Sequence, residues 1–424
     1  MTFIRFLSGA TGLVIKGNKA YYAWCSFLLV LILVGAGAYV TQLRDGLVVT
    51  KMRDSVTWAF YIGNFTFLVG VAAAAVMLVI PAYLYEWGPI KEIVILGELL
   101  AISACIMCLL FVTVDMGRPD RAWHLMPVVG KLNFPGALLS WDVVVLNAYL
   151  ILNLTIVTYL LYSAFMGKEP NHHFTWPLVI FSIPFAISIH TVTAFIYNGM
   201  VARPYWNASI LAPKFLASAF CSGPAVLLIL LQILRRMTRL KIQDAAIWKI
   251  AELMAYAMAI NLFFTGAEIF KDFYSNAHHS IHTRYFYFGI GGHRAIVPYA
   301  WMSLFFEIVA FLLFMIPTTR KNVVTLNAGC ILIYAGCYIE KGIGLLIPGL
   351  TPDGLGEIYE YTPSKTEVLV AAGIFSLGFL IYTLLLKVAV PVMLGQFRIT
   401  DIAGAPVGSP KPGAPEAGLA GAGH

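Results

Sequence analysis

The chain has 424 residues, of which 60% are hydrophobic and 12% are charged, and its formal net charge is +7. Because soluble domains contain about 25% charged residues, this composition excludes a soluble globular protein and predicts a polytopic helical membrane protein. Membrane lipid is then the main partner of its surface, and no nucleic acid is expected to bind.

Ten apolar runs have a length of about twenty residues, which is enough for a helix to cross a bilayer. They lie near residues 21–40, 57–84, 93–114, 138–161, 176–197, 211–234, 247–270, 297–317, 323–346 and 368–392. The nine tryptophans fall near the ends of these runs, where interfacial aromatic residues are expected. We therefore predict an all-α fold of about ten transmembrane helices, with residues 1–401 as one integral membrane domain. Residues 402–424, rich in Gly, Ala and Pro, are predicted to be a disordered cytoplasmic tail.

Basic residues indicate the orientation of the spans. An even number of spans places both termini on one side, and short basic loops favour the cytoplasmic side. The deciding loop is residues 235–241, which is short and holds four basic residues in the run Arg-Arg-Met-Thr-Arg-Leu-Lys. We therefore predict cytoplasmic termini, and we place residues 115–124, 271–296 and 347–367 on the extracytoplasmic side of the cytoplasmic membrane.

The order of polar residues indicates an internal duplication. The third and seventh spans both end outside with an acid, Asp115 and Glu268, and the fourth and eighth spans both carry a tryptophan and an acid. Two four-helix bundles, at about residues 55–200 and 205–350 with flanking helices, account for this order.

The motif at residues 115–124 concentrates charge directly behind an apolar run. Its sequence is Asp-Met-Gly-Arg-Pro-Asp-Arg-Ala-Trp-His, and charges at the edge of the hydrocarbon are costly unless they are paired or used. Gly117 and Pro119 would suffice for a helix stop. A stop, however, does not need two carboxylates, two guanidiniums, an indole and an imidazole together.

Quinone chemistry does need such groups, because a proton accompanies each electron and the two carbonyls need hydrogen-bond donors. Asp115 is the candidate base, and Arg121 is the candidate cation that holds its charge. His124 or His190 is the candidate donor to the other carbonyl.

The motif also resembles a known family. Asp115, Gly117, Arg118, Pro119, Arg121, Trp123 and His124 look like the signature of the NrfD/PsrC family of quinone-interacting membrane subunits. Residues 64–81 and 203–223 also resemble this family, and the first stretch, with residues 42–47 before it, looks most like the DsrP type of DsrMKJOP sulfur-metabolism complexes. The resemblance covers about residues 20–395.

The resemblance implies what the residues alone do not. In the family, the Asp and the second Arg of the motif line the quinone pocket, which points to Asp115 and Arg121. It also implies menaquinone or another quinone as bound substrate, and an extracytoplasmic ferredoxin-like iron-sulfur subunit as redox partner. For the DsrP type it implies a haem b membrane subunit, a multihaem cytochrome c and a cytoplasmic iron-sulfur subunit in dissimilatory sulfur metabolism.

Further candidates lie in the first predicted bundle. Trp123, Trp141 and Tyr197 are candidates for an aromatic wall around the quinone, and Arg118 is a further binding candidate. His190 lies on the same face of the fifth span as Tyr197. It is either a structural histidine satisfied by a neighbouring hydroxyl, or a proton carrier or quinone donor.

The second predicted bundle carries acids within its spans. Asn261 and Glu268 share a face of the seventh span, and Glu307 lies about midway along the eighth. Carboxylates inside a membrane are functional candidates by default, so we predict a proton path here, with helix–helix hydrogen bonding as the alternative. Glu98, near the cytoplasmic start of the third span, either begins such a path or reaches the interface.

No metal site and no covalently bound cofactor are predicted. Cys105 and Cys108 form one Cys-x-x-Cys pair in mid-span with no second pair, and a haem would need two helical histidines or a Cys-x-x-Cys-His motif. The histidines of loop 271–296 are expected to be surface residues that dock a partner protein or line the outer mouth of the second bundle, with a metal site as the less favoured alternative. They are His278, His279, His282 and His293.

Two other functions stay open. A secondary transporter or proton channel fits a duplicated bundle, although no pair of broken Gly-rich half-helices occurs at matching positions. A passive anchor for redox partners would not need Asp115, His190, Glu268 and Glu307 near the core.

Overall fold

The computed structural model describes residues 2–126, 128–275 and 280–399. In this part of the chain ten helices are long and apolar enough to cross a membrane, which confirms the predicted all-α polytopic class. The predicted tail at 402–424, together with His278 and His279, lies outside the described residues.

The helices follow the predicted spans in order, with short helices at the ends of several of them. They are α1 (Thr2–Ile15), α2 (Lys19–Asp45), η1 (Leu47–Val49), α3 (Phe60–Ala72), α4 (Ala74–Val79), η2 (Ile80–Leu84), α5 (Gly88–Lys91), α6 (Val94–Asp115), η3 (Pro119–Leu125), α7 (Leu138–Phe165), α8 (His172–Asn198), α9 (Leu211–Met237), α10 (Asp244–Ser275), α11 (Ile281–Phe288), α12 (Val297–Met315), α13 (Pro317–Lys321), α14 (Val323–Lys341), α15 (Ile343–Leu350) and α16 (Lys365–Met393).

Two predicted spans are divided rather than continuous. The second consists of α3, α4 and the π-helix η2, which contains Pro81. A proline has no N–H for the helical ladder, and a π-turn is one way in which a helix accommodates such a defect. The ninth consists of α14 and α15, which meet at Gly342.

Local sequence explains several helix ends. Asn18, Asn171 and Asn322 cap α2, α8 and α14, because their side-chain oxygens accept backbone N–H groups of the first turn. The last turn of α2 ends at Gly46, whose φ of +82° favours glycine.

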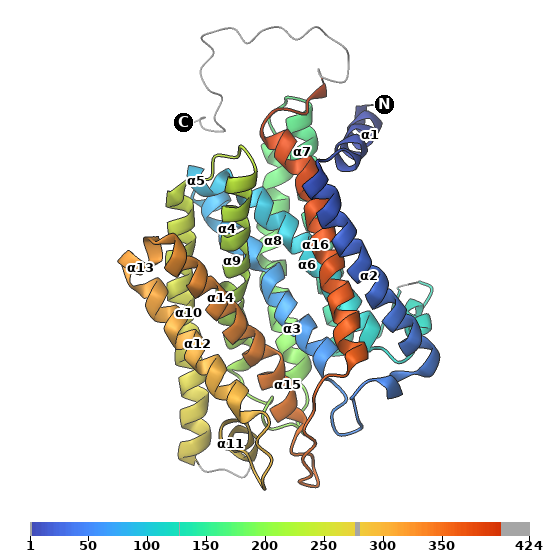
Figure 1. Ribbon diagram of the computed structural model, residues 1–424, viewed down its shortest axis with the longest axis vertical. Coiled ribbons are helices and arrows are strands. Elements are labelled where there is room, and N and C mark those ends of the chain that lie inside the picture. The colour runs from blue at the N-terminus through green and yellow to red at the C-terminus, as the bar shows by residue number, and fades with distance from the viewer. Residues whose placement is uncertain (1, 127, 276–279, 400–424) are drawn as a thin grey trace.

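In chain order we describe the spans as a first group (α3, α6, α7 and α8), a second group (α9, α10, α12 and α14) and the pair α2 and α16, which lies at one side of the molecule (Figure 1). In the first group α3 packs on α6, α6 on α7 and α7 on α8; in the second, α9 packs on α10, α10 on α12 and α12 on α14. The groups meet where α3 contacts α9 and α14. α2 and α16 pair with each other, and α16 also packs on α6. The predicted bundle boundaries at 55–200 and 205–350 stay predictions.

Burial distinguishes central from peripheral spans. The apolar segment of α6 is 78% buried, whereas that of α2 is 11% buried. Trp24 and Phe27 are among the large apolar side chains that α2 exposes, as expected of a helix that faces lipid.

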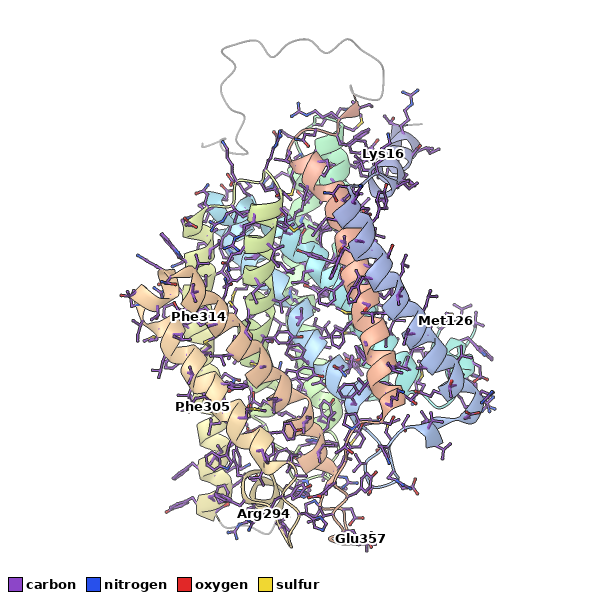
Figure 2. The ribbon with its side chains drawn as sticks, in the orientation of Figure 1. Lys16, Met126, Arg294, Phe305, Phe314 and Glu357 are labelled. Carbon is purple, nitrogen blue, oxygen red and sulfur yellow. The ribbon has the colours of Figure 1, made fainter. Side chains whose placement is uncertain are left out.

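The two ends of the molecule differ in the segments they carry. Lys16, beside α1, lies at one end, and Arg294 and Glu357 lie at the other (Figure 2). We call the latter the outer end. α6 runs toward it, so that Asp115 lies at the outer end of its helix. Which end faces the cytoplasm stays a prediction from the basic loops.

Candidate functional site

Asp115 is the last residue of α6, just before the chain turns. Gly117 and Pro119 follow it, and Pro119 begins the short 3-10 helix η3. The Asp115 residue is half-buried, but its Oδ1 atom is enclosed and has no hydrogen-bond partner. A buried carboxylate oxygen without a donor is unusual, and it marks Asp115 as a group available to a ligand or a proton.

Side chains of α2 and α3 hold this helix end in place. Gln42 Nε2 donates to the carbonyl oxygen of Val114 at 2.7 Å, and the Tyr61 hydroxyl donates to Gln42 Oε1 at 2.7 Å. Both side chains are buried. Neither was a sequence candidate, because a glutamine at the end of one span gives no sign of the carbonyl that it will meet on another.

A second carboxylate, Glu367 of α16, lies near Asp115. It is fully buried and close enough to interact electrostatically with Asp115. Tyr61 interacts with both carboxylates. Sequence reasoning missed Glu367 because it is the third residue of its helix, where an acid usually serves as a cap.

The rest of the motif lies on the exposed surface of η3. Arg118 pairs with Asp120 at 2.9 Å, with both side chains largely exposed, and this hydrogen-bonded guanidinium lowers the pKa of Asp120. The indole of Trp123 stacks on the His124 ring at 3.8 Å between centroids.

Arg121 is exposed as well. Among the described residues, no ion pair joins Arg121 to Asp115. The predicted pairing of these two residues therefore stays a prediction for the ligand-bound protein.

The interior of the first group contains a row of buried polar side chains. Thr193 donates to Asp142 at 2.9 Å, and Thr66 and Tyr197 share a hydrogen bond through their hydroxyls. His190 Nδ1 lies 3.0 Å from the carbonyl oxygen of Ala186, whereas its Nε2 atom has no partner.

The predicted aromatic wall is divided between two environments. Tyr197 is buried, packs edge-on against Trp58 and Trp206, and interacts electrostatically with Asp115. Trp141 is partly exposed, and its indole N–H donates to the carbonyl oxygen of Pro135. Tyr197 thus lies in the buried interior of the first group, whereas Trp141 lies at the helix surface.

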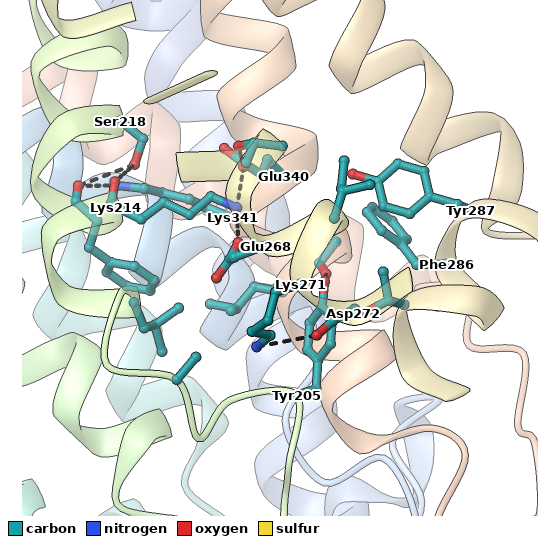
Figure 3. Close-up of a pocket in the computed structure, with 18 of the residues that line it drawn as sticks. Tyr205, Lys214, Ser218, Glu268, Lys271, Asp272, Phe286, Tyr287, Glu340 and Lys341 are labelled. Carbon is teal, nitrogen blue, oxygen red and sulfur yellow. Dashed lines mark hydrogen bonds and ion pairs between the residues drawn. The ribbon is translucent and has the colours of Figure 1, made fainter. Parts of the chain in front are cut away.

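The second group holds an ion-paired cluster near the outer end (Figure 3). The Lys214 ammonium of α9 lies 2.6 Å from Glu268 of α10 and 2.8 Å from Glu340 of α14. Thr265 donates to Glu340 at 3.1 Å. Lys214 was not a sequence candidate, because a lysine near the start of a span is usually an interfacial residue.

Glu307 extends this cluster toward the middle of the membrane. Asn261 Nδ2 donates to Glu307 Oε2 at 3.2 Å, and Glu307 interacts with Glu340. The second oxygens of Glu307 and Glu340 have no hydrogen-bond partner. The sequence candidates Asn261, Glu268 and Glu307 thus belong to one network.

A cavity opens onto the cluster at its outer side. Its volume is about 70 Å³ and its wall includes Tyr205, Lys271 and Asp272, so it has room for a few water molecules. Burial raises the pKa of Tyr205 well above its usual range, and that phenol therefore stays neutral. Figure 3 shows Lys214 beside Glu268 and Lys271 beside Asp272, and Lys271 is the more exposed of the two lysines.

Glu98 lies apart from both sites. It is buried in the inner half of α6, and its Oε2 atom has no hydrogen-bond partner. Its role as the start of a proton path stays a prediction.

The described histidines and cysteines form no evident metal centre. No group of three or more His, Cys, Asp or Glu side chains within residues 2–126, 128–275 and 280–399 is placed to hold a metal ion. His282 is buried beside the carbonyl oxygen of Thr351, and His293 lies 3.6 Å from Glu360.

Comparison with known proteins supplies the context for these sites. A family model described as "Polysulphide reductase, NrfD" matches residues 48–352. A putative membrane subunit of dimethyl sulfoxide reductase from Halobacterium salinarum is 25% identical, covering 84% of this chain and 88% of the relative. A selenate reductase subunit from Mesobacillus selenatarsenatis is 22% identical, covering 92% and 98%. An Hdr-like menaquinol oxidoreductase integral membrane subunit of Archaeoglobus fulgidus is 22% identical, covering 88% and 94%.

Proposed function

The chain belongs to the NrfD polysulphide reductase family, and on that premise we propose that it is the quinone-binding membrane subunit of a multi-subunit electron-transfer complex. Each of the three relatives is named as a subunit of a reductase or oxidoreductase, and one name specifies menaquinol. The observation that carries the proposal is the enclosed, unpartnered Oδ1 atom of Asp115 at the outer end of a central helix.

The residues around Asp115 fit the chemistry of a quinone headgroup. Asp115 takes a proton from a quinol hydroxyl, or returns one to a quinone. Gln42 and Tyr61 hold the helix end rigid through their hydrogen bonds, and Arg121 and His124, exposed on η3, lie a few residues further along the chain. Menaquinone is the substrate that we propose, exchanging two electrons and two protons at this end of the molecule.

Asp115→Asn tests this site, because it keeps the shape of the side chain and removes the base. We expect kcat for oxidation of a soluble naphthoquinol by the intact complex to fall by about 10²-fold or more, the usual contribution of a general base. Complex assembly should be unchanged. Asp120→Asn, an exposed carboxylate of the same motif, is the matched control and should retain full activity.

The alternatives give different results in the same experiment. A passive anchor would turn over quinol equally well with Asp115→Asn. A secondary transporter would show no quinol oxidation in the wild-type complex either. Wild-type activity in Asp115→Asn would remove the proposed site.

The proposal also specifies the redox partners of the chain. Electron transfer needs a one-electron centre close to the quinone, and we propose an extracytoplasmic ferredoxin-like iron-sulfur subunit at the exposed η3 surface. By resemblance, the complex would also contain a haem b membrane subunit, a multihaem cytochrome c and a cytoplasmic iron-sulfur subunit, and would serve sulfur metabolism in the cytoplasmic membrane. A photo-crosslinking amino acid at Trp123 should capture the iron-sulfur subunit, whereas one at Trp24, on lipid-exposed α2, should not.

We further propose that the second group of helices conducts protons. The specific observation is the chain of contacts from the outer cavity through Glu268, Lys214 and Glu340 to Glu307 and Asn261. Glu307→Gln should leave quinol oxidation measurable and lower the number of protons moved per electron in sealed vesicles. Glu357→Gln, an exposed acid at the same end, is the control. An unchanged ratio in Glu307→Gln would exclude a relay through this residue.

A further inference from the structure

Glu367 is a buried carboxylate that the family match does not cover. The match spans residues 48–352, whereas Glu367 belongs to α16 and has no exposed surface. It nevertheless lies near the end of α6, because both meet the start of α3. Tyr361, which donates to Glu367, accepts the backbone N–H of Phe60. The next residue, Tyr61, donates to Gln42, which donates to the carbonyl oxygen of Val114 beside Asp115. The last span of the chain thus contributes a second acid to the site at the end of α6.

A capping role explains part of this arrangement. Ser364 and Glu367 form a capping box at the start of α16. Glu367 Oε2 accepts the backbone N–H of Ser364 at 2.7 Å and that of Lys51 at 3.0 Å, and Oε1 accepts the Tyr361 hydroxyl at 2.5 Å. The single carbonyl oxygen of a glutamine can accept the two backbone N–H groups as a cap does, so capping alone does not require a charged side chain.

Among the described residues, neither of the two carboxylates forms an ion pair. In the described part of the chain, neither Asp115 nor Glu367 has a cationic group within 4 Å. Two negative charges close together in a medium of low dielectric repel strongly.

We propose that Asp115 and Glu367 act as a pair, in which each carboxylate takes one of the two protons released when quinol is oxidised. This inference rests on the proposed quinone site and deepens it. The two quinol O–H bonds break, one proton goes to Asp115 and one to Glu367, and two electrons pass singly to the iron-sulfur centre of the partner. Quinone is the product, and in quinone reduction the same protons move the other way.

Tyr361 holds the Glu367 carboxylate from the loop before α16. It is half-buried in the loop before α16, and its hydroxyl also accepts the backbone N–H of Phe60. Burial, followed by the neighbouring Glu367, raises the pKa of Tyr361. The phenol therefore keeps its proton at neutral pH and donates a hydrogen bond to Glu367.

Glu367→Gln in the intact complex tests the pair, because it keeps the size and one oxygen for the capping N–H groups, and removes the charge together with the acceptor of the Tyr361 hydroxyl. With a soluble naphthoquinol as donor, we expect kcat to fall by about 10-fold to 10²-fold with little change in KM, and the pH profile of kcat to change shape. Ser364→Ala is the matched control, because it weakens the cap and leaves the carboxylate. It should lower thermal stability and leave kcat and its pH profile unchanged.

Binding of a quinone-site inhibitor, 2-heptyl-4-hydroxyquinoline N-oxide, is measured as well. It distinguishes a wrong assignment of the carboxylate pair from a wrong assignment of the quinone site. Wild-type kcat and an unchanged pH profile in Glu367→Gln, with inhibitor binding retained, would overturn the pair and leave the quinone site standing. Equal losses of kcat in Glu367→Gln and Ser364→Ala would reduce Glu367 to a cap. No inhibitor binding and no turnover in the wild-type complex would instead remove the quinone site itself.

Discussion

Removal of the Lys214 ammonium should destabilise the second group of helices strongly. The side chain of Lys214 is only 15% exposed, and Glu268 and Glu340 are 23% and 15% exposed, so the methionine of Lys214→Met leaves two carboxylates without a counter-charge. Removing one partner of a buried ion pair costs about 3–5 kcal/mol, and partial exposure favours the lower end, about 3 kcal/mol. The change in Tm for each kcal/mol of lost stability becomes smaller as the chain becomes longer. For this chain, a loss of about 3 kcal/mol corresponds to a decrease in Tm of about 3–6 °C.

The cysteines of the chain provide the assay. Five of the six are buried, so a thiol-reactive fluorophore reports unfolding of the detergent-solubilised protein in a Cys25→Ser background. Lys271→Met is the matched control, since that lysine borders the same cavity with a 54% exposed side chain and should cost little. Adding Glu340→Gln to Lys214→Met should restore much of the lost stability. An unchanged Tm in Lys214→Met would refute the idea that this ammonium neutralises the buried acids.

Three further results are expected. A reporter fused after Met237 should lie in the cytoplasm and one inserted before α11 outside it, and the reverse would move the proposed quinone site to the other face. The Gln232 amide donates to Asn327 Oδ1 at 2.7 Å, and Gln232→Leu removes this partner. The free energy of unfolding, measured by thermal unfolding, should fall by about 1–3 kcal/mol in Gln232→Leu and by less when leucine replaces both residues. A Cβ atom on Gly35 would lie 2.6 Å from the backbone of α16, so Gly35→Val should lower the Tm, while Gly37→Val, whose Cβ meets nothing within 4 Å, should not.

The fold class could be read from the sequence because the bilayer imposes one length on every span. The ten apolar runs therefore coincide with ten helices. The division of the second span at η2 was not predicted, since its apolar pattern continues through Pro81. The hydrophobicity of a segment predicts that it lies in the membrane, but it does not predict whether the backbone hydrogen bonds of the helix are regular.

The candidate site could be predicted only in part, for a similar reason. Asp115 stood out because it is charged and follows an apolar run. Gln42, Lys214 and Glu367 did not, because their neighbours come from helices far away in the sequence. Which helix faces which is decided by packing, and a single sequence contains no direct record of those contacts. Arg121 was a candidate because it is close to Asp115 in the sequence, but the two side chains are not in contact in the structure.

The pairing of α2 with α16 also has a consequence for how the protein is made. α2 leaves the ribosome long before α16, about 320 residues earlier in the chain, although each is the other's principal neighbour. At a synthesis rate of about 5–20 residues per second, roughly 15–60 s pass between them, and for that time α2 waits in the membrane beside lipid. A chain released early keeps Asp115 but lacks Glu367, so a truncated product can enter the bilayer without acquiring the carboxylate pair. Its unpaired first span is then a feature by which membrane proteases can distinguish it from the finished protein.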